Sequence, residues 1–248
     1  MSKVVYAIAQ IQTLRENFEK NLENHMKYIK EAARQNAGFI LFPEMSLTGY
    51  ERELAANQSL EAEDERLNVL EQAATDYQMV ISVGGPLRID NRLYIASWVF
   101  TPEGKREIYI KRFLHPGEEL FFESREDYAP MIKYQGERIA LAICFELEVD
   151  EHIRSAVERD ASIYTASIFY SDNGTLHGLQ RLQQLAKHYH LPILMSNHCG
   201  TCWGMKAGGC SSIWSADGEI VASADGLTPS LVIAEQTGDT WRGRVLQF

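Results

Sequence analysis

Three residues whose side chains can take part in acyl transfer stand close after short apolar segments. They are a carboxylate, an ammonium group and a thiol: Glu44, Lys111 and Cys144. The apolar segments before them cover residues 39–42, 107–110 and 139–143. Segments of this length are typical of buried strands, and a charged group at the end of such a strand is partly removed from water. Because partial burial shifts pKa values, these positions are candidates for catalysis.

The three groups together supply the parts of a covalent hydrolysis. A thiol is a strong nucleophile once it becomes a thiolate. A carboxylate can take the thiol proton and later return it to a leaving amine. An ammonium group can stabilise the oxyanion of a tetrahedral intermediate. Taken singly, each group also has a structural interpretation, since charged residues at strand ends are often solvated and a cysteine in a strand is often a small buried hydrophobe.

The rest of the chain alternates between strand and helix patterns. Apolar residues recur at helical spacing from Leu14 to Ile29 and from Leu60 to Tyr77. Further helices are expected at 149–159 and 178–189. Other strands are expected at 4–10, 79–83, 93–100, 162–167, 193–196, 210–214, 220–222 and 231–234. Gly84–Gly85–Pro86 is expected to end the strand at 79–83. The alternation predicts a mixed α/β layered domain.

Composition restricts the class of protein. A length of 248 residues is ample for one domain covering 1–248, and 45% hydrophobic residues are typical of globular proteins. The net charge is −10 and no Lys/Arg cluster appears, so nucleic acid is not an expected partner. No apolar run approaches the roughly 20 residues needed to span a membrane, and no export signal is recognised. Reduced thiols in the cytoplasm are therefore expected.

The motifs around the three residues resemble those of the nitrilase-like carbon–nitrogen hydrolases. Phe42–Pro43–Glu44, followed by Thr48–Gly49–Tyr50, resembles the first catalytic motif of that family. Tyr109–Ile110–Lys111 resembles its lysine motif, and Ile143–Cys144–Phe145–Glu146 its cysteine motif. The resemblance covers essentially the whole chain. It also assigns the family's later acidic residue and arginine to Glu151 and Arg154.

The resemblance implies a four-layer α-β-β-α sandwich, a Glu–Lys–Cys triad and a homodimer or larger homo-oligomer. It also implies a second glutamate after the lysine, for which Glu118 and Glu119 are both candidates. The spacing to Phe122–Glu123 favours Glu118 as the catalytic one. The chain departs from the family pattern at three places beside the triad: Glu146, Glu148–Val149–Asp150 and Ser124–Arg125. Because these departures lie outside the triad, they do not change the expected chemistry. They do mean that the substrate cannot be carried over from the family.

The resulting hypothesis is a hydrolase of non-peptide carbon–nitrogen bonds. Glu44 deprotonates Cys144, Lys111 and the backbone N–H of Phe145 hold the oxyanion, and a thioester is then hydrolysed with release of ammonia. Small linear amides, ω-amide acids and N-carbamoyl amines are the expected substrates, with nitriles as an alternative. The expected substrate-binding residues are Phe145, Glu119, Tyr50 and His198. No metal or organic cofactor is required.

Two other classes of function stay open. His198, Cys199, Cys202 and Cys210 could be counted as zinc ligands, and Cys199–Cys202 could form a redox pair. The second ligand pair that makes zinc spacing persuasive is missing, so loop cysteines are the simpler interpretation. Arg154 and Arg181 could each bind a substrate carboxylate, although a structural ion pair is the simpler role. A silent binding module on the same fold is disfavoured because all three triad residues are present.

Overall fold

The first strand, β1 (Lys3–Gln10), is buried on both of its faces. In the computed structural model, which describes residues 3–125 and 129–248, its alternate side chains enter two apolar cores. Tyr6 and Ile8 enter one core, and Ala7 and Ala9 enter the other. Because successive side chains of a strand point to opposite faces, β1 must lie inside a layered structure with packing above and below.

β1 lies within a seven-stranded sheet of the described residues, with the order β15-β14-β1-β2-β3-β4-β5. β1, β2 and β3 are parallel to one another, and the remaining neighbours pair antiparallel. The other strands of this first sheet are β2 (Phe39–Leu41), β3 (Val80–Ile89), β4 (Arg92–Phe100), β5 (Arg106–Ile110), β14 (Ser230–Thr237) and β15 (Thr240–Gln247).

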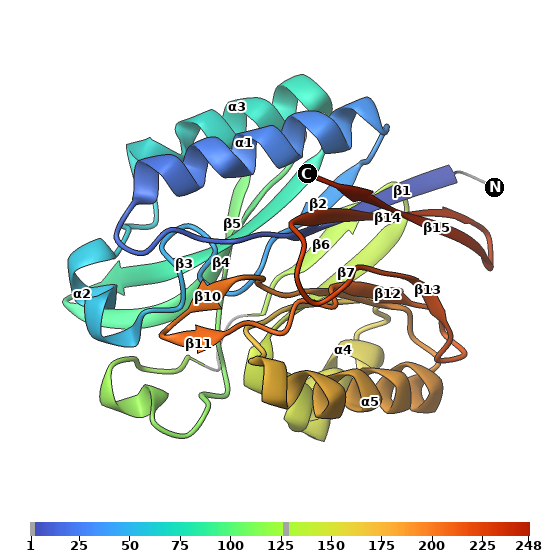
Figure 1. Ribbon diagram of the computed structural model, residues 1–248. Helices are drawn as coiled ribbons and strands as arrows, with labels where there is room; N and C mark the ends of the chain where they lie inside the picture. The colour runs from blue at the N-terminus through green and yellow to red at the C-terminus, as the bar shows by residue number, and fades with distance from the viewer. Residues whose placement is uncertain (1–2, 126–128) are drawn as a thin grey trace.

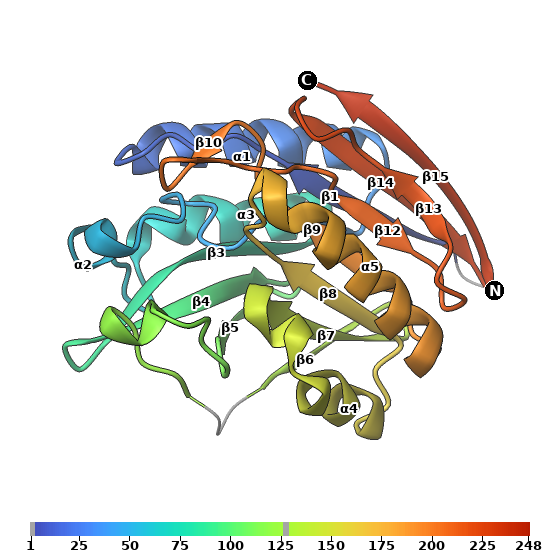
Figure 2. The same ribbon diagram turned by 60° about the horizontal axis from the view of Figure 1, so that its bottom comes forward.

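A second sheet of six strands faces the first and has the order β13-β12-β9-β8-β7-β6 (Figure 2). β7, β8 and β9 run parallel at its centre. Its strands are β6 (Met131–Tyr134), β7 (Glu137–Ile143), β8 (Ile163–Ser167), β9 (Ile193–Ser196), β12 (Ser212–Trp214) and β13 (Ile220–Ser223). A short ribbon of β10 (Thr201–Cys202) and β11 (Met205–Lys206) stands apart from both sheets.

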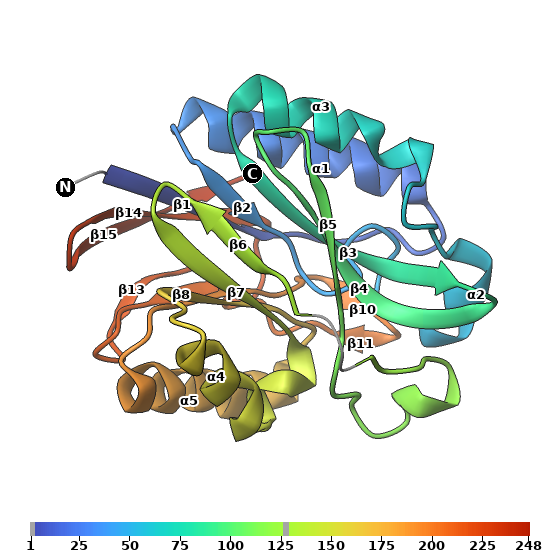
Figure 3. The same ribbon diagram turned by 180° about the vertical axis from the view of Figure 1, so that it is seen from behind.

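Helices cover the outer face of each sheet. α1 (Phe18–Arg34) and α3 (Asn68–Tyr77) lie over the first sheet, and α4 (Asp150–Glu158) and α5 (Asp172–Tyr189) lie under the second (Figure 1). The short helix α2 (Ala55–Gln58) lies beside the β3–β4 hairpin (Figure 3). The order of layers is helix, sheet, sheet, helix, so the predicted four-layer sandwich is confirmed. Within the described part of the chain, no helix is long and apolar enough to cross a membrane.

The strand predicted at 79–83 does not end at the glycines. β3 continues through Gly84, Gly85 and Pro86 to Ile89. Proline is tolerated there because the neighbouring β2 has already ended, so no ladder bond on that side needs a proline N–H. The carbonyl of Pro86 instead accepts a hydrogen bond from the backbone N–H of Leu60, at 2.8 Å.

Two predicted helices have different limits in the structure. α5 begins at Asp172, six residues before the predicted start, and its Gly178 lies against the ring of Tyr170. A Cβ at Gly178 would meet that ring, so this glycine allows close packing and does not interrupt the helix. The segment from Leu60 is helical only from Asn68 onward, apart from a single 3₁₀ turn at Glu65–Leu67. The sequence pattern does not predict β6, β10, β11 or β15.

Candidate active site

Glu44 stands in a tight turn that directly follows β2. The turn packs against β3 at Gly84, where a Cβ would lie only 2.5 Å from the backbone nitrogen of Met45. Nε2 of His198 donates a hydrogen bond to the carbonyl oxygen of Glu44, at 2.7 Å. The side chain of Glu44 is 1% exposed. Gly84 on β3, which has no side chain, and the buried His198 therefore hold the Glu44 turn in the interior of the molecule.

Lys111 follows β5 and lies between two buried carboxylates. Its backbone N–H donates to the carbonyl of Ile95 on β4, which extends the sheet pairing by one residue. Its Nζ lies 2.8 Å from Oε1 of Glu44 and 2.9 Å from Oε1 of Glu118. All three side chains are almost completely buried. The ammonium group therefore holds the two carboxylates in one cluster.

Glu118, and not Glu119, belongs to this cluster. The carboxylate of Glu118 also accepts hydrogen bonds from the hydroxyl of Tyr50, at 2.6 Å, and from the backbone N–H of His115, at 2.7 Å. Glu119 is exposed, and its carboxylate accepts a hydrogen bond from the backbone N–H of Gly117, at 2.6 Å. The expectation that Glu119 contacts substrate is therefore not met by its position.

Cys144 comes from the other sheet. It follows β7 and begins a 3₁₀ turn, Cys144–Glu148, with a φ of 46°. A non-glycine residue in this left-handed region is uncommon and marks a sharp turn that the surroundings must hold. The turn directs Sγ toward the carbonyl oxygen of Phe169, at 3.7 Å. The three residues of the expected triad thus come from both sheets: Glu44 and Lys111 follow strands of the first sheet, and Cys144 follows a strand of the second.

Glu146 ties the cysteine turn to the segment that follows Lys111. Its carboxylate accepts hydrogen bonds from the backbone N–H groups of Arg112, at 2.6 Å, and Ile143, at 2.7 Å. It also accepts one from the hydroxyl of Tyr109, at 2.7 Å. Glu146 is wholly buried, so these contacts replace the water that its charge would otherwise need. The departure from aspartate at this position therefore has a structural role.

Burial and mutual charge set the protonation of the cluster. Burial raises the pKa of Glu44 to about 7, against the opposing effect of Lys111 and with a further increase from Glu118. Burial alone would lower the pKa of Lys111, but the carboxylates of Glu44 and Glu118 more than offset it and leave this pKa raised. Burial, reinforced by the Glu44 charge, raises the pKa of Cys144 well above its ordinary value. The resting thiol is therefore neutral and needs a base.

A cavity of about 500 Å³ opens above the thiol. Cys144, Phe145 and Tyr50 all line it, so two of the expected substrate-binding residues lie where a substrate would meet the nucleophile. Its other lining residues come from loops, two 3₁₀ turns, β11 and the start of α5: Arg52, His115, Glu148, Phe169, Tyr170, Ser171, Gly174, His177, Trp203 and Met205. Sequence spacing does not single out these residues, because they come from separate segments.

His198 is not among the residues that line this cavity. Its ring is wholly buried, and Nε2 donates to the backbone of Glu44 as described above. Nδ1 has no hydrogen-bond partner among the described residues. Burial lowers the pKa of His198 to about 4, so the ring is neutral. The expected contact between His198 and substrate is therefore replaced by support of the Glu44 turn.

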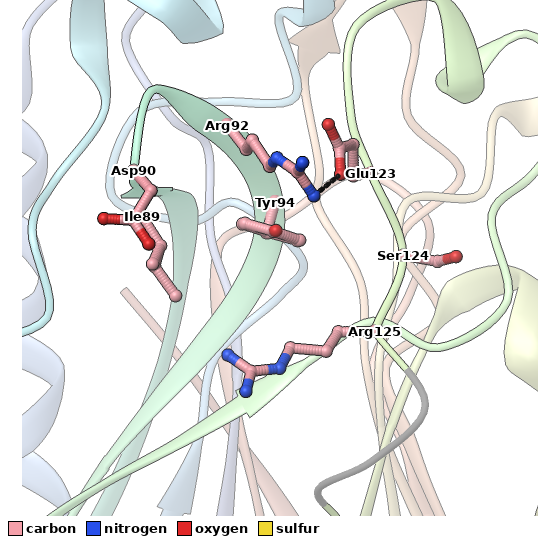
Figure 4. A pocket seen from close by; sticks show the side chains of 7 residues that line it. All are labelled: Ile89, Asp90, Arg92, Tyr94, Glu123, Ser124 and Arg125. Carbon is pink, nitrogen blue, oxygen red and sulfur yellow. Dashed lines mark hydrogen bonds and ion pairs between the residues drawn. The ribbon is translucent and has the colours of Figure 1, made fainter.

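A larger cavity lies elsewhere and holds no triad residue. It has a volume of about 740 Å³ and is lined by the tip of the β3–β4 hairpin and the segment Glu123–Arg125 (Figure 4). Two of its lining residues, Arg92 and Glu123, form an ion pair at 3.1 Å. Because reaction chemistry requires the nucleophile, the smaller cavity at Cys144 is the candidate active site.

The described residues of the 199–210 region do not assemble the zinc site considered above. All four cysteines of the chain are free thiols. Sγ of Cys202 accepts a hydrogen bond from the backbone N–H of Tyr50, at 3.3 Å, and Cys199 is almost completely buried. Across residues 3–125 and 129–248, no group of three or more His, Cys, Asp or Glu side chains could hold a metal ion.

Comparison with known proteins agrees with this geometry. The sequence profile of the carbon–nitrogen hydrolase family matches residues 6–243. The chain therefore belongs to that family and is an enzyme that hydrolyses carbon–nitrogen bonds, of the nitrilase-like type. It is 28% identical to "Hydrolase in pqqF 5′ region" of Pseudomonas protegens, over 86% of this chain and 75% of that protein. It is 26% identical to a nitrilase of Pyrococcus abyssi, over 95% of this chain and 89% of that protein.

Solved structures share the fold. The cysteine-to-alanine mutant of an amidase from Nesterenkonia sp. AN1, in complex with butyramide, superposes with a TM-score of 0.86 at 21% identity. The match covers 95% of this chain and 92% of that one. Another structure of the same amidase, with a TM-score of 0.85 at 21% identity over 94% of this chain and 90% of that one, carries the acetamide moiety of fluoroacetamide on its active-site cysteine. At this identity, the likeness establishes the fold.

Proposed function

We propose that this enzyme hydrolyses small non-peptide amides through a thioester on Cys144, with Glu44 as base and Lys111 as oxyanion partner. One observation carries the proposal: the Lys111 ammonium lies between two buried carboxylates, and the charges of all three groups act on the thiol of Cys144, which lines the cavity. A thiol, a base of matched pKa and a fixed cation are the parts that acyl transfer needs.

The first half of the reaction forms the thioester. The Glu44 carboxylate takes the Cys144 proton while Sγ attacks the amide carbonyl carbon. Lys111 Nζ and the backbone N–H of Phe145 stabilise the oxyanion. When the intermediate collapses, the carbon–nitrogen bond breaks and the Glu44 proton passes to the leaving nitrogen. Ammonia departs and the acyl group stays on sulfur.

The second half releases the acid. Glu44, again ionised, takes a proton from water, and the resulting hydroxide attacks the thioester carbonyl. The same two donors stabilise the second oxyanion. Collapse breaks the carbon–sulfur bond, and Glu44 returns its proton to the Cys144 sulfur. A base whose pKa lies near neutral suits both directions of proton transfer, and burial raises the pKa of Glu44 to about 7.

Glu118 acts as a positioning residue in this scheme. It does not line the cavity, and its carboxylate accepts hydrogen bonds from Lys111, Tyr50 and the backbone of His115. These contacts fix the ammonium group at the distance that both Glu44 and the oxyanion require. Nitriles would add to the same thiol, and therefore belong in the substrate panel as the alternative.

The enzyme works without a metal or organic cofactor, because the chemistry above requires only protein side chains and water.

The enzyme also assembles as a homodimer or larger homo-oligomer. Exposed apolar side chains on the helices beside the site, Val157 on α4 and Leu176 on α5, support assembly through this surface. Light scattering of the wild type and of Leu176→Glu tests this assembly. A monomeric wild type would exclude it.

The experiment that tests the function is ammonia release from a panel of substrates. The panel contains short amides, ω-amide acids, N-carbamoyl amines and nitriles. Wild type should turn over at least one class, whereas Cys144→Ala should be inactive on all of them with an unchanged fold. Cys210→Ala, which removes a half-buried thiol outside the cavity, is the matched control and should keep wild-type activity. Activity that survives in Cys144→Ala would overturn the proposal.

A further inference from the structure

The cavity above Cys144 contains a buried guanidinium that has no polar partner. Arg52 lies in a 3₁₀ turn after Tyr50 and lines the cavity, yet only 9% of it is exposed. No hydrogen bond or ion pair joins its guanidinium to any residue that the structure describes, and its Nε is fully buried. A desolvated charge without a partner costs free energy, so this position requires an explanation beyond stability.

Aromatic stacking fixes the plane of this guanidinium. Its central carbon lies 4.0 Å from the ring centre of Trp203 and 5.2 Å from that of Tyr50. Gly117 lies against its edge, because a Cβ there would come within 3.1 Å of Nη1. Stacking covers a face of the guanidinium. Because Nε is buried, a carboxylate in the cavity would meet this cation at its terminal nitrogens.

The acidic side chains around the cavity are all engaged with other groups. Glu51 and Glu53 accept hydrogen bonds from the backbone and the indole of Trp203. Glu118 is held by Lys111 and Tyr50, as described above. Glu148 faces the imidazole of His177, at 3.4 Å. The protein therefore supplies none of these four carboxylates to Arg52.

Other arginines near the site differ from Arg52 in this respect. Arg181 pairs with Asp150 and donates to the carbonyl of Leu147, and exposed Arg154 lies 3.9 Å from Glu158. Neither lines the cavity. Both therefore have the structural ion pairs expected from the sequence, and Arg52, which sequence patterns do not single out, is the cation presented to a ligand.

We propose that Arg52 receives a carboxylate of the substrate, so that the preferred substrates are amides that carry an acid group. This inference rests on the proposed function, since it names the substrate class of the same site. The carboxylate can belong to the acyl part, as in an ω-amide acid, or to the amine part, as in an N-carbamoyl amino acid. In both cases the two N–H groups of one edge bind the two carboxylate oxygens.

The test compares ligands that differ only in charge at the far end. Glutaramate carries a carboxylate where glutaramide carries a neutral amide of nearly the same size, and 4-aminobutanamide carries a cation. Succinamate and adipamate vary the length, and N-carbamoylglycine and N-carbamoyl-β-alanine place the acid on the amine side. For the best acid, wild-type kcat/KM at pH 8 should exceed that of its neutral counterpart by at least about 10-fold, as a charge-assisted pair supports.

Variants at Arg52 separate recognition from chemistry. Arg52→Gln should lower kcat/KM for the best acid, mainly through KM, at least about 10-fold more than it lowers kcat/KM for glutaramide. The kcat/KM of Arg52→Lys for the acid should fall between those of wild type and Arg52→Gln, because lysine keeps the charge and loses the planar guanidinium. Arg66→Gln is the matched control, since Arg66 is also stacked on an aromatic ring, Phe18, but lies outside the cavity. It should change neither rate.

Two results would overturn the inference while leaving the hydrolase standing. One is a wild type that prefers the neutral or cationic amide, and the other is an Arg52→Gln enzyme that loses acid and neutral substrates equally. If no amide is turned over, the proposed function fails, and calorimetry with Cys144→Ala decides the carboxylate site by itself. Tighter binding of glutaramate than glutaramide, abolished in the double variant with Arg52→Gln, would support the site, whereas equal affinities would refute it.

Discussion

The ionisation of Glu44 is expected to set how kcat/KM depends on pH. A carboxylate in water is ionised at neutral pH, but burial raises the pKa of Glu44 to about 7. In the proposed mechanism the base is the ionised form of Glu44, so the fraction of competent enzyme falls as pH drops through this value. We expect kcat/KM to decline about tenfold per pH unit well below pH 7.

The measurement is a pH profile on an amide whose own charge does not change over the range studied. Glu44→Gln should lower kcat/KM at every pH by about 10²- to 10⁴-fold, which is the usual contribution of a general base. A profile that stays flat down to pH 5 would show that no group of raised pKa acts as the base.

Two neighbouring glutamates offer a matched comparison. Glu118→Gln removes a buried charge that holds Lys111, so kcat should fall about 10²-fold or more. Glu119→Gln changes an exposed carboxylate one residue further on and should leave kcat within about twofold. If Glu119→Gln were the damaging change, the assignment of the second glutamate would be reversed.

At the scale of single residues, sequence patterns single out Glu44, Lys111 and Cys144 but not the residues around them. Glu44, Lys111 and Cys144 each follow an apolar strand, and both motif and position single them out. Arg52 carries no such signal, because its lack of a partner depends on loops that are distant in sequence. His198 was expected at the cavity, and its buried ring instead supports Glu44, which spacing alone could not distinguish.

At the scale of elements, the turn after β2 depends on a glycine in the neighbouring strand. A Cβ at Gly84 would lie 2.5 Å from the nitrogen of Met45 and 2.8 Å from the carbonyl oxygen of Pro43. Both are backbone atoms, so the clash with an added Cβ can be relieved only if the Glu44 turn moves. Gly84→Ala should therefore cost about 1–3 kcal/mol of stability and at least about 10²-fold in kcat.

Thermal denaturation and steady-state kinetics measure both effects. Gly174→Ala in α5 is the control for stability, because a Cβ there would meet only Oγ of Ser171 within 4 Å, at 3.7 Å. Alanine in a helix is favoured over glycine, so this change should not lower Tm. Normal Tm and activity in Gly84→Ala would contradict the close packing of β3 on the turn.

The Glu146 side chain also joins two elements of the fold. Its carboxylate accepts from the backbone at both Arg112 and Ile143, so it connects the segment after β5 to the end of β7. Glu146→Gln replaces one acceptor oxygen by an NH₂ group that faces donors. We expect a loss of about 1.5–3 kcal/mol in unfolding free energy and a lower kcat, measured by denaturant titration and kinetics. Unchanged stability would mean that these hydrogen bonds are dispensable.

Element boundaries were predictable where burial patterns are regular. The strands at 4–10, 93–100, 162–167 and 193–196 lie within one residue of the structure. α1 was predicted from Leu14, but Leu14 is 44% exposed and the buried face includes Asn21 and His25. These polar residues face inward because Asn21 binds the carbonyl of Leu47 and His25 binds the hydroxyl of Ser46. Apolar periodicity cannot reveal a buried polar face.

At the scale of the whole molecule, the active site exists only while the two sheets stay packed. The hydroxyl of Ser167 on β8 donates to the carbonyl of Phe42, at 2.8 Å, beside the Glu44 turn. The hydroxyl of Ser196 on β9 donates to the carbonyl of Ala9 on β1, at 2.6 Å. These contacts set the register between the sheet that carries Lys111 and the sheet that carries Cys144.

Ser167→Ala should leave the Phe42 carbonyl unsatisfied, cost about 1 kcal/mol of stability and reduce kcat. Ser223→Ala on β13, where the hydroxyl bonds only the adjacent Ala224 carbonyl, is the control and should be close to neutral. Chemical denaturation with parallel activity assays would measure both. Full kcat in Ser167→Ala would show that the register does not depend on this bond.

The layer order was predictable from the family resemblance, and the strand order was not. Strand order depends on long-range pairs such as β1 with β14, whose paired residues are 220 to 234 positions apart. The pairing of β15 with β14 makes β15 the edge strand of the first sheet, and the sequence pattern does not predict this strand. Site residues from two sheets converge only because of this order.

The central claim is that Cys144 carries the acyl group during turnover. The most direct measurement is rapid acid quenching during the first turnover of a saturating amide, followed by peptide mass mapping. The peptide that contains Cys144 should gain the mass of the substrate less ammonia, in step with the first equivalent of ammonia released. A first equivalent of ammonia released while Cys144 stays unmodified would contradict the claim.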